Sequence, residues 1–254
     1  MALGTYDETV AALTEIVERC VAEDDRIGYF AGMYVAVTTT VRQRAADGRF
    51  ADPARMERLV TGFAGHYLSS LEAWRVGGPC PESWRAAFAA AGRWRPVILQ
   101  HLLLGMNAHI NLDLGVAVSE LADGSALADV RADFDAINDV LGELVDACQG
   151  ALDEVSPWMG LVDRIGGSND ETMIRFSLVI ARRQAWSAAT RFAALPAGPA
   201  RDAEIAAVDR ASAGVAHVVE HPGAVASAAL ALVRLRERAP VGDVIRLLAA
   251  VRPA

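Results

Sequence analysis

The sequence has no lysine, so each of its 24 basic residues is an arginine. Together with abundant alanine, this choice is typical of a GC-rich coding sequence and is weak evidence for phosphate recognition. The net charge of −8 argues against generic nucleic-acid binding, which needs a basic face. We therefore expect no nucleic-acid partner.

Cysteine is also scarce: the three thiols, at Cys20, Cys80 and Cys148, are odd in number and far apart, and no CxxC pattern occurs. This argues against a disulfide framework and against a cysteine-rich zinc site. The chain also lacks a nucleophile elbow, a phosphate-binding loop and a dinucleotide fingerprint. Its first residues do not follow the basic and then apolar pattern of a signal peptide, so we expect a soluble, cytoplasmic protein.

Period-two alternation with β-branched residues is missing as well, which argues against a sheet. We expect an all-α fold, a single domain over residues 1–254 with about nine to eleven helices around a buried central helix at 97–118. Capping residues, glycines and prolines set the ends of the predicted helices. These helices cover residues 5–21, 26–48, 53–76, 81–91, 97–118, 130–155, a short piece after Pro157, 168–194, 201–220, 223–238 and 241–251.

The predicted central helix is almost wholly apolar, yet it contains His101, Asn107, His109, Asn111 and Asp113. Burying an unpartnered neutral polar group costs about 2–7 kcal/mol, so these side chains should be hydrogen-bonded, bound to a metal or part of a site. Steps of four residues place His101, His109 and Asp113 on one stripe of the helix and the two asparagines on another. The same polar residues argue against a membrane span, and we expect no membrane partner.

The pair His109 and Asp113 is the best-motivated candidate centre. A carboxylate four residues away can hold the histidine tautomer while the other ring nitrogen acts as a base. Alternatively, both side chains bind one divalent metal ion, with His101 completing the shell. A third interpretation is a buried polar network that fixes helix packing. Gly105, in the same stripe, leaves room for a neighbouring backbone or a ligand.

Two further patterns carry ionisable groups. Arg182 and Arg183 lie in an otherwise apolar helix, so one of them must face inward or extend to water. An inward arginine could neutralise Asp113 or bind an anionic group of a substrate. The segment HVVEH at 217–221 matches the inverted zincin pattern. Because Pro222 follows at once, its second histidine lies at a helix end, and we predict that this segment binds no metal.

The segment NAHINLDL (107–114), preceded by QHLLLGM, resembles a family of all-helical bacterial proteins known only as a domain of unknown function. GYFAGMYVAVTTTV, the DFDAIN that ends at Asn138, and ARRQAW (181–186) are similar to its other shared blocks. The resemblance implies an all-α single domain and supplies no chemistry. By spacing alone, H-x-x-x-D is also similar to helices of the zinc-dependent phospholipase C and nuclease group. The family resemblance places emphasis on Tyr34, Thr38, Asn107, His109, Asn111, Asp113, Asn138, Arg183 and Trp186.

We therefore expect an enzyme with a buried His/Asp centre that acts on a small-molecule ligand, in its most concrete form by metal-assisted hydrolysis. The alternatives are a metal-free lyase, isomerase or cyclase of specialised metabolism, and a non-catalytic binding or scaffold protein. The expected catalytic residues are His109, Asp113, Asn107 and Asn111. The expected substrate contacts are Tyr34, Thr38, Asn138, Arg183 and Trp186. The expected ligands of a divalent metal ion are His109, Asp113 and His101.

Overall fold

The computed structural model describes residues 3–122, 127–156 and 170–252, with the side chains at 139, 145, 146 and 170–177 left out, and these ranges are helical with no strand. The expected all-α bundle is confirmed for this part of the chain, with ten helices when the consecutive pieces α5, η1 and α6 are counted as one. The elements are α1 (Tyr6–Glu23), α2 (Ile27–Ala46), α3 (Pro53–Arg75), α4 (Glu82–Ala91), α5 (Ile98–Ala108), η1 (His109–Asp113), α6 (Leu114–Leu121), α7 (Leu127–Val155), α9 (Asp170–Ala193), α10 (Pro199–Glu220), α11 (Ala224–Arg234) and α12 (Val241–Ala249).

Local sequence signals set several helix ends as expected. The Thr5 hydroxyl accepts the N–H of Glu8 at 3.2 Å and caps α1. The Asp52 carboxylate accepts the N–H of Arg55 at 2.9 Å and caps α3, whose first residue is Pro53. A short polar side chain at the cap satisfies an N–H that the helix itself cannot, and proline at the first position loses no hydrogen bond.

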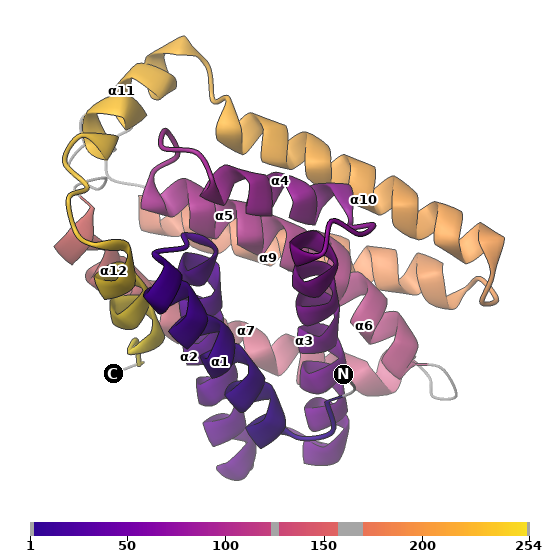
Figure 1. Cartoon of the computed structure of the whole chain (residues 1–254). Helices are drawn as coiled ribbons and strands as arrows, with labels where there is room; N and C mark the ends of the chain where they lie inside the picture. The colour runs from indigo at the N-terminus through magenta and orange to yellow at the C-terminus, as the bar shows by residue number, and fades with distance from the viewer. Residues whose placement is uncertain (1–2, 123–126, 157–169, 253–254) are drawn as a thin grey trace.

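The helices form two groups on opposite sides of the bundle. Figure 1 shows α10 running along one side of the bundle, with α4 and α5 beneath it and α9 further back, and α10 packs against both α4 and α5. The helices α1, α2 and α3 extend away from α10 on the other side, and α12 packs against α1 and α2. The stretch from α5 to α6 contacts α2, α3, α4, α9 and α10 and is mostly buried.

The elements α5, η1 and α6 form one continuous helix from Ile98 to Leu121, called the central helix below. The single buried helix expected at 97–118 is therefore observed and runs three residues further. Its 24 residues are long and apolar enough to cross a membrane, and 72% of the stretch that meets this criterion is buried inside the bundle. The bent pair α10 and α11 meets the same criterion. Length and composition are weak evidence here, because core helices satisfy them too.

A glycine allows another helix to approach the central helix closely. A Cβ atom on Gly105 would lie 2.5 Å from Cγ of Phe30, which comes from α2. The space predicted beside Gly105 is therefore occupied by an aromatic side chain and not by a backbone or a ligand. On α6, a Cβ atom on Gly115 would lie 3.2 Å from the carbonyl oxygen of Ala185 on α9, so this crossing is also close.

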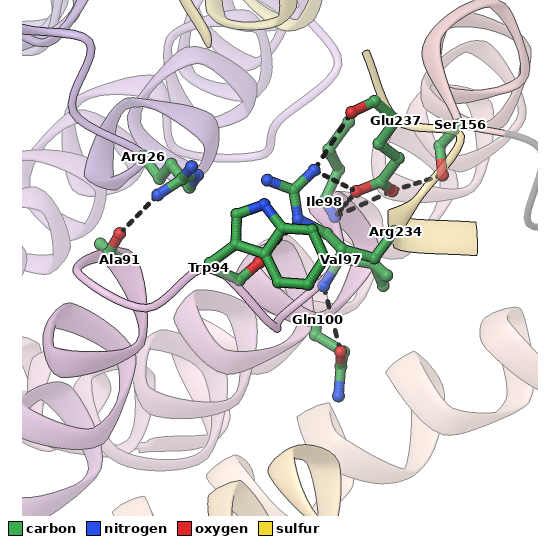
Figure 2. A network of polar contacts seen from close by, with 9 residues as sticks. All are labelled: Arg26, Ala91, Trp94, Val97, Ile98, Gln100, Ser156, Arg234 and Glu237. Atoms are coloured by element: carbon green, nitrogen blue, oxygen red, sulfur yellow. Dashed lines mark hydrogen bonds and ion pairs between the residues drawn. The ribbon is translucent and has the colours of Figure 1, made fainter. Parts of the chain in front are cut away.

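A buried carboxylate holds the first turn of the central helix. Figure 2 shows Glu237, which follows α11, accepting the N–H of Ile98 at 3.1 and 3.2 Å and the hydroxyl of Ser156 at 2.6 Å. Arg234 lies 3.6 Å from the same carboxylate, and its guanidinium covers the ring of Trp94. The free N–H groups and the dipole of a helix N-terminus favour a negative charge at this place.

Some of the predicted helix ends are wrong by a few residues. The central helix begins at Ile98 and not at 97, and α11 ends at Arg234 and not at 238. Shifts of this size are common, because helix ends fray and caps come from distant residues such as Glu237. The helix predicted after Pro157 and the start of the helix predicted at 168–194 lie outside the described residues.

Candidate functional site

The central helix contains one π turn, from His109 to Asp113, in which the N–H of Leu114 bonds to the carbonyl of His109. A π turn holds about one residue more than an α turn, and side chains four residues apart still lie on one face of the helix. His109 and Asp113, at the two ends of this turn, are therefore neighbours, as they would be in a regular α-helix. Single π turns inside α-helices are frequent at functional sites.

His109 and Asp113 form a buried pair. Nδ1 of His109 lies 2.9 Å from Oδ2 of Asp113, and each residue is 3% exposed. The indole N–H of Trp84, on α4, donates to the same oxygen at 2.9 Å. Because the carboxylate accepts at Nδ1, the neutral imidazole carries its proton there and presents a lone pair at Nε2. The result is an oriented base, held from behind by a carboxylate that accepts two hydrogen bonds.

Aromatic rings enclose the imidazole of His109. Phe63, on α3, stacks on it with ring centres 3.5 Å apart and planes 7° apart. Tyr34 and Phe30, both on α2, approach at steep angles with ring centres 4.5 and 5.6 Å away. These contacts hold the plane of the ring, and Asp113 holds its orientation within that plane, so Nε2 keeps a fixed direction.

A cavity of about 160 Å³ lies beside the central helix. Its wall is formed by one face each of α2, α3, the central helix, α7 and α9, and most of the lining is aliphatic. A space of this size is comparable with the ~150 Å³ cavity that takes up benzene in an engineered protein. His109 faces this cavity, whereas Asp113, predicted to face it too, lies behind the ring. Among the described side chains, the polar ones in the wall are Tyr34, Thr38, His109, Cys148, Gln149 and Arg182.

Four buried polar atoms of this wall have no hydrogen-bond partner among the described residues. They are Nε2 of His109, the hydroxyl oxygens of Tyr34 and Thr38, and the amide nitrogen of Gln149. Thr38 lies one turn from Tyr34 on α2, and its proximity lowers the pKa of the Tyr34 hydroxyl, against the larger effect of burial. The two hydroxyls do not form a hydrogen bond with each other, so both are unsatisfied. Each unsatisfied group costs free energy until water or a ligand binds it. The wall therefore offers an acceptor at His109 and donors around it.

Burial sets the protonation of the two facing groups. It lowers the pKa of His109 below the usual value of about 6.5, and the hydrogen bond to Asp113 opposes this shift. Burial also raises the pKa of the Tyr34 hydroxyl well above its usual value. At pH 7 the imidazole is therefore neutral and the phenol keeps its proton. The cavity presents a base and a proton donor whose rings are in contact.

Asn107 and Asn111, predicted to be catalytic, belong to the contact between the central helix and α10. The Asn107 amide donates to the carbonyl of Ser212 at 2.8 Å and accepts from the Asn111 amide at 2.9 Å. Neither asparagine lines the cavity, because their stripe lies on the opposite side of the helix from His109. The structure assigns this pair to helix packing.

Arg182, on α9, points inward and lines the cavity. Arg183, predicted as a substrate contact, is exposed, because adjacent residues of a helix point in directions about 100° apart. Asn138, on α7, accepts a hydrogen bond from Nε of Arg182 and so reaches the site indirectly. Trp186 packs on Phe134 and does not line the cavity. Of the five predicted substrate contacts, Tyr34 and Thr38 are the two in its wall.

The predicted metal ligands do not surround one point. His101 lies about 12 Å along the helix axis from His109, since eight residues separate them. It contacts the ring of Tyr29 and lines a different, much smaller cavity. Catalytic zinc sites use three protein ligands, and the described residues contain no group of three or more His, Cys, Asp or Glu side chains placed for a metal ion. The donor set therefore does not fit a divalent ion.

The HVVEH segment forms the end of α10, as predicted. Its Glu220 pairs with Arg93, and the ring of His221 turns back to the carbonyl of His217. Both histidines are exposed. The segment is therefore the end of a surface helix, and its histidines do not line the cavity.

These observations define an all-α protein with a mostly apolar pocket beside its central helix and a buried, oriented histidine in the wall of that pocket. A comparison with protein-family models matches residues 6–222 to a family described as a family of unknown function (DUF5995), and the chain belongs to that family. The expected membership of an all-helical family of unknown function is thus confirmed. Comparisons with curated proteins and with solved structures find no match.

Proposed function

We propose that the protein is an enzyme that moves a proton on a small, mostly apolar molecule bound in the central cavity, with His109 as the general base. The observation that carries the proposal is the unpartnered Nε2 of His109 in a mostly aliphatic wall. Among the functions expected from the sequence this is the metal-free one, since the donor set does not fit a metal ion. It retains the predicted roles of His109 and Tyr34 and makes Asp113 a positioning residue.

The surrounding groups suit proton abstraction next to a carbonyl or a comparable electron sink. Asp113 holds the tautomer and stabilises the imidazolium that forms when Nε2 takes a proton. Tyr34 can donate its hydroxyl proton in a hydrogen bond to the oxygen on which negative charge develops. The mostly apolar lining provides a low local dielectric constant, which strengthens both interactions. Isomerases, lyases and cyclases use this combination.

The test needs a probe whose reaction requires only a base in an apolar pocket. In 5-nitrobenzisoxazole the base removes the proton at carbon 3, the electron pair forms the nitrile, and the ring N–O bond breaks to give a coloured phenolate. We expect the wild-type protein to accelerate this reaction and His109→Gln to reduce the rate by about 10²-fold, the lower range for one general base. His66→Gln, which changes a histidine of α3 that pairs with Glu120 at the surface, should keep the wild-type rate.

The pH profile gives a second readout. Because burial lowers the pKa of His109, the rate should be constant above the usual histidine pKa of about 6.5 and fall only at more acidic pH. Equal rates for wild type and His109→Gln would contradict the proposal. Binding of the probe without turnover would favour the non-catalytic binding protein.

A further inference from the structure

Arg182 is a buried cation in the wall of the central cavity, 5% exposed. Its hydrogen bonds go to two neutral oxygens of α7, the side-chain oxygen of Asn138 and the carbonyl of Phe134. The guanidinium also lies over the Phe134 ring, 4.2 Å from its centre. The nearby Asp135 is already paired with Arg131. Among the ion pairs between described residues, none involves Arg182.

A buried charge without a counter-ion is costly, and proteins rarely keep one that has no role. Burial lowers the pKa of Arg182 to about 10, so the group is still charged at pH 7. The two neutral acceptors engage Nε and one Nη atom and orient the guanidinium without compensating its charge. A planar guanidinium matches the two oxygens of a carboxylate with a pair of parallel hydrogen bonds.

We infer that the ligand of the cavity is an apolar monocarboxylate, whose carboxylate binds Arg182 and whose hydrocarbon body fills the aliphatic space. The inference rests on the proposed function for the use of this cavity and adds the class of substrate. Arg182 enters the wall from α9 and His109 from the central helix, so one bound molecule can contact both. The arginine would bind the anion, and the base would act on the body of the ligand.

The test compares two molecules of nearly the same shape, 3-phenylpropanoate and 3-phenylpropanamide, which differ in charge. By isothermal titration calorimetry we expect the wild-type protein to bind the acid about tenfold more tightly than the amide, as one charge-assisted hydrogen-bonded contact provides. In Arg182→Gln the ratio should fall to about one while the affinity for the amide is kept. Arg183→Gln, the same change at the adjacent exposed position, should keep the wild-type ratio.

Arg182 also joins α7 to α9 through its hydrogen bonds, so its loss could affect folding. Arg182→Lys is therefore included as a variant that keeps the charge without the planar guanidinium. Thermal melting shows which variants are folded. We expect the lysine variant to keep a reduced preference for the acid. Equal binding of acid and amide by wild type would overturn the inference, as would binding of neither or an unchanged ratio in Arg182→Gln. If the benzisoxazole reaction proceeds while the acid has no preference, only the ligand class is wrong. If the acid is preferred but the reaction fails, the base is wrong and the role of Arg182 stands.

Discussion

A single carboxylate oxygen, Oδ2 of Asp113, accepts two hydrogen bonds at the centre of this protein. One donor is Nδ1–H of His109 and the other is the indole N–H of Trp84, each at 2.9 Å. The first bond sets the tautomer of the base, and the second fixes the carboxylate against α4. Function and packing are thus combined in one side chain, and they can be separated by the choice of substitution.

Asp113→Asn should leave the fold nearly intact and impair the base. The amide oxygen can take the place of Oδ2 and accept both donors, so the free energy of unfolding should change by less than about 1 kcal/mol. The negative charge that stabilises the imidazolium is lost, so the benzisoxazole rate should fall by about tenfold or more. Thermal melting and the rate assay measure the two effects separately.

Asp113→Ala is the contrasting variant. It leaves two buried donors without an acceptor, at a cost of about 1–3 kcal/mol for each. A large loss of stability in both variants would favour a pure packing role for the pair and would count against His109 as a base.

The sequence alone predicts the pairing of His109 with Asp113, but not the other contacts of this site. His109 and Asp113 are four residues apart in an apolar helix, and helical geometry alone brings them together. Trp84 is 29 residues from Asp113 in the chain, and no periodicity links them. Arg182 and Arg183 are chemically equal neighbours, and the rotation of α9 against α7, a tertiary property, decides which one faces inward.

At the scale of elements, the central helix was predictable in extent but not in detail. Its density of apolar residues predicts burial, whereas the π turn at His109–Asp113 leaves no mark in composition or period. Gly105 could be recognised as a place of close approach, but its neighbour could not be named. That neighbour, Phe30, contacts His109 edge-on and so links the packing of α2 to the site.

Gly105→Ala should destabilise the protein, because the new Cβ would lie 2.5 Å from Cγ of Phe30 and 2.9 Å from its Cβ. The inner part of Phe30 cannot move without its backbone, so we expect a loss of about 1–3 kcal/mol, typical of overpacking. Gly62→Ala on α3 is the matched control. No neighbour lies within 4 Å of its new Cβ, so alanine should stabilise that helix by about 0.5–1 kcal/mol. Urea unfolding of the two variants measures both signs, and equal behaviour would contradict the packing argument.

For the whole molecule, the buried neutral histidines predict a stability that falls with acidification. Burial, reinforced by nearby arginines, lowers the pKa of His101 to about 3. Between about pH 6.5 and that value the unfolded chain binds a proton that the folded chain does not, so the free energy of unfolding decreases as the pH falls. His109 contributes with the same sign, and Glu237, whose pKa is raised by burial, contributes with the opposite sign.

His101→Gln should make this dependence shallower by up to about 1.4 kcal/mol per pH unit, the largest effect of one group. Urea unfolding between pH 6.5 and pH 4 measures the slope for wild type and variant. His217→Gln, at the exposed end of α10, should keep the wild-type slope. An unchanged slope in His101→Gln would show that this histidine is not neutral in the folded protein.

The carboxylate of Glu237 that accepts the N–H of Ile98 belongs to a residue made 139 positions later. During synthesis at about 5–20 residues per second, the start of the central helix therefore waits about 7–28 s for its acceptor. The residues that close this contact lie beyond the matched family region, which ends at 222. A nascent chain that has already emerged with α2, α5 and α7 still lacks the group that ties them to the C-terminal end. A residue made well after the central helix thus completes the first turn of that helix.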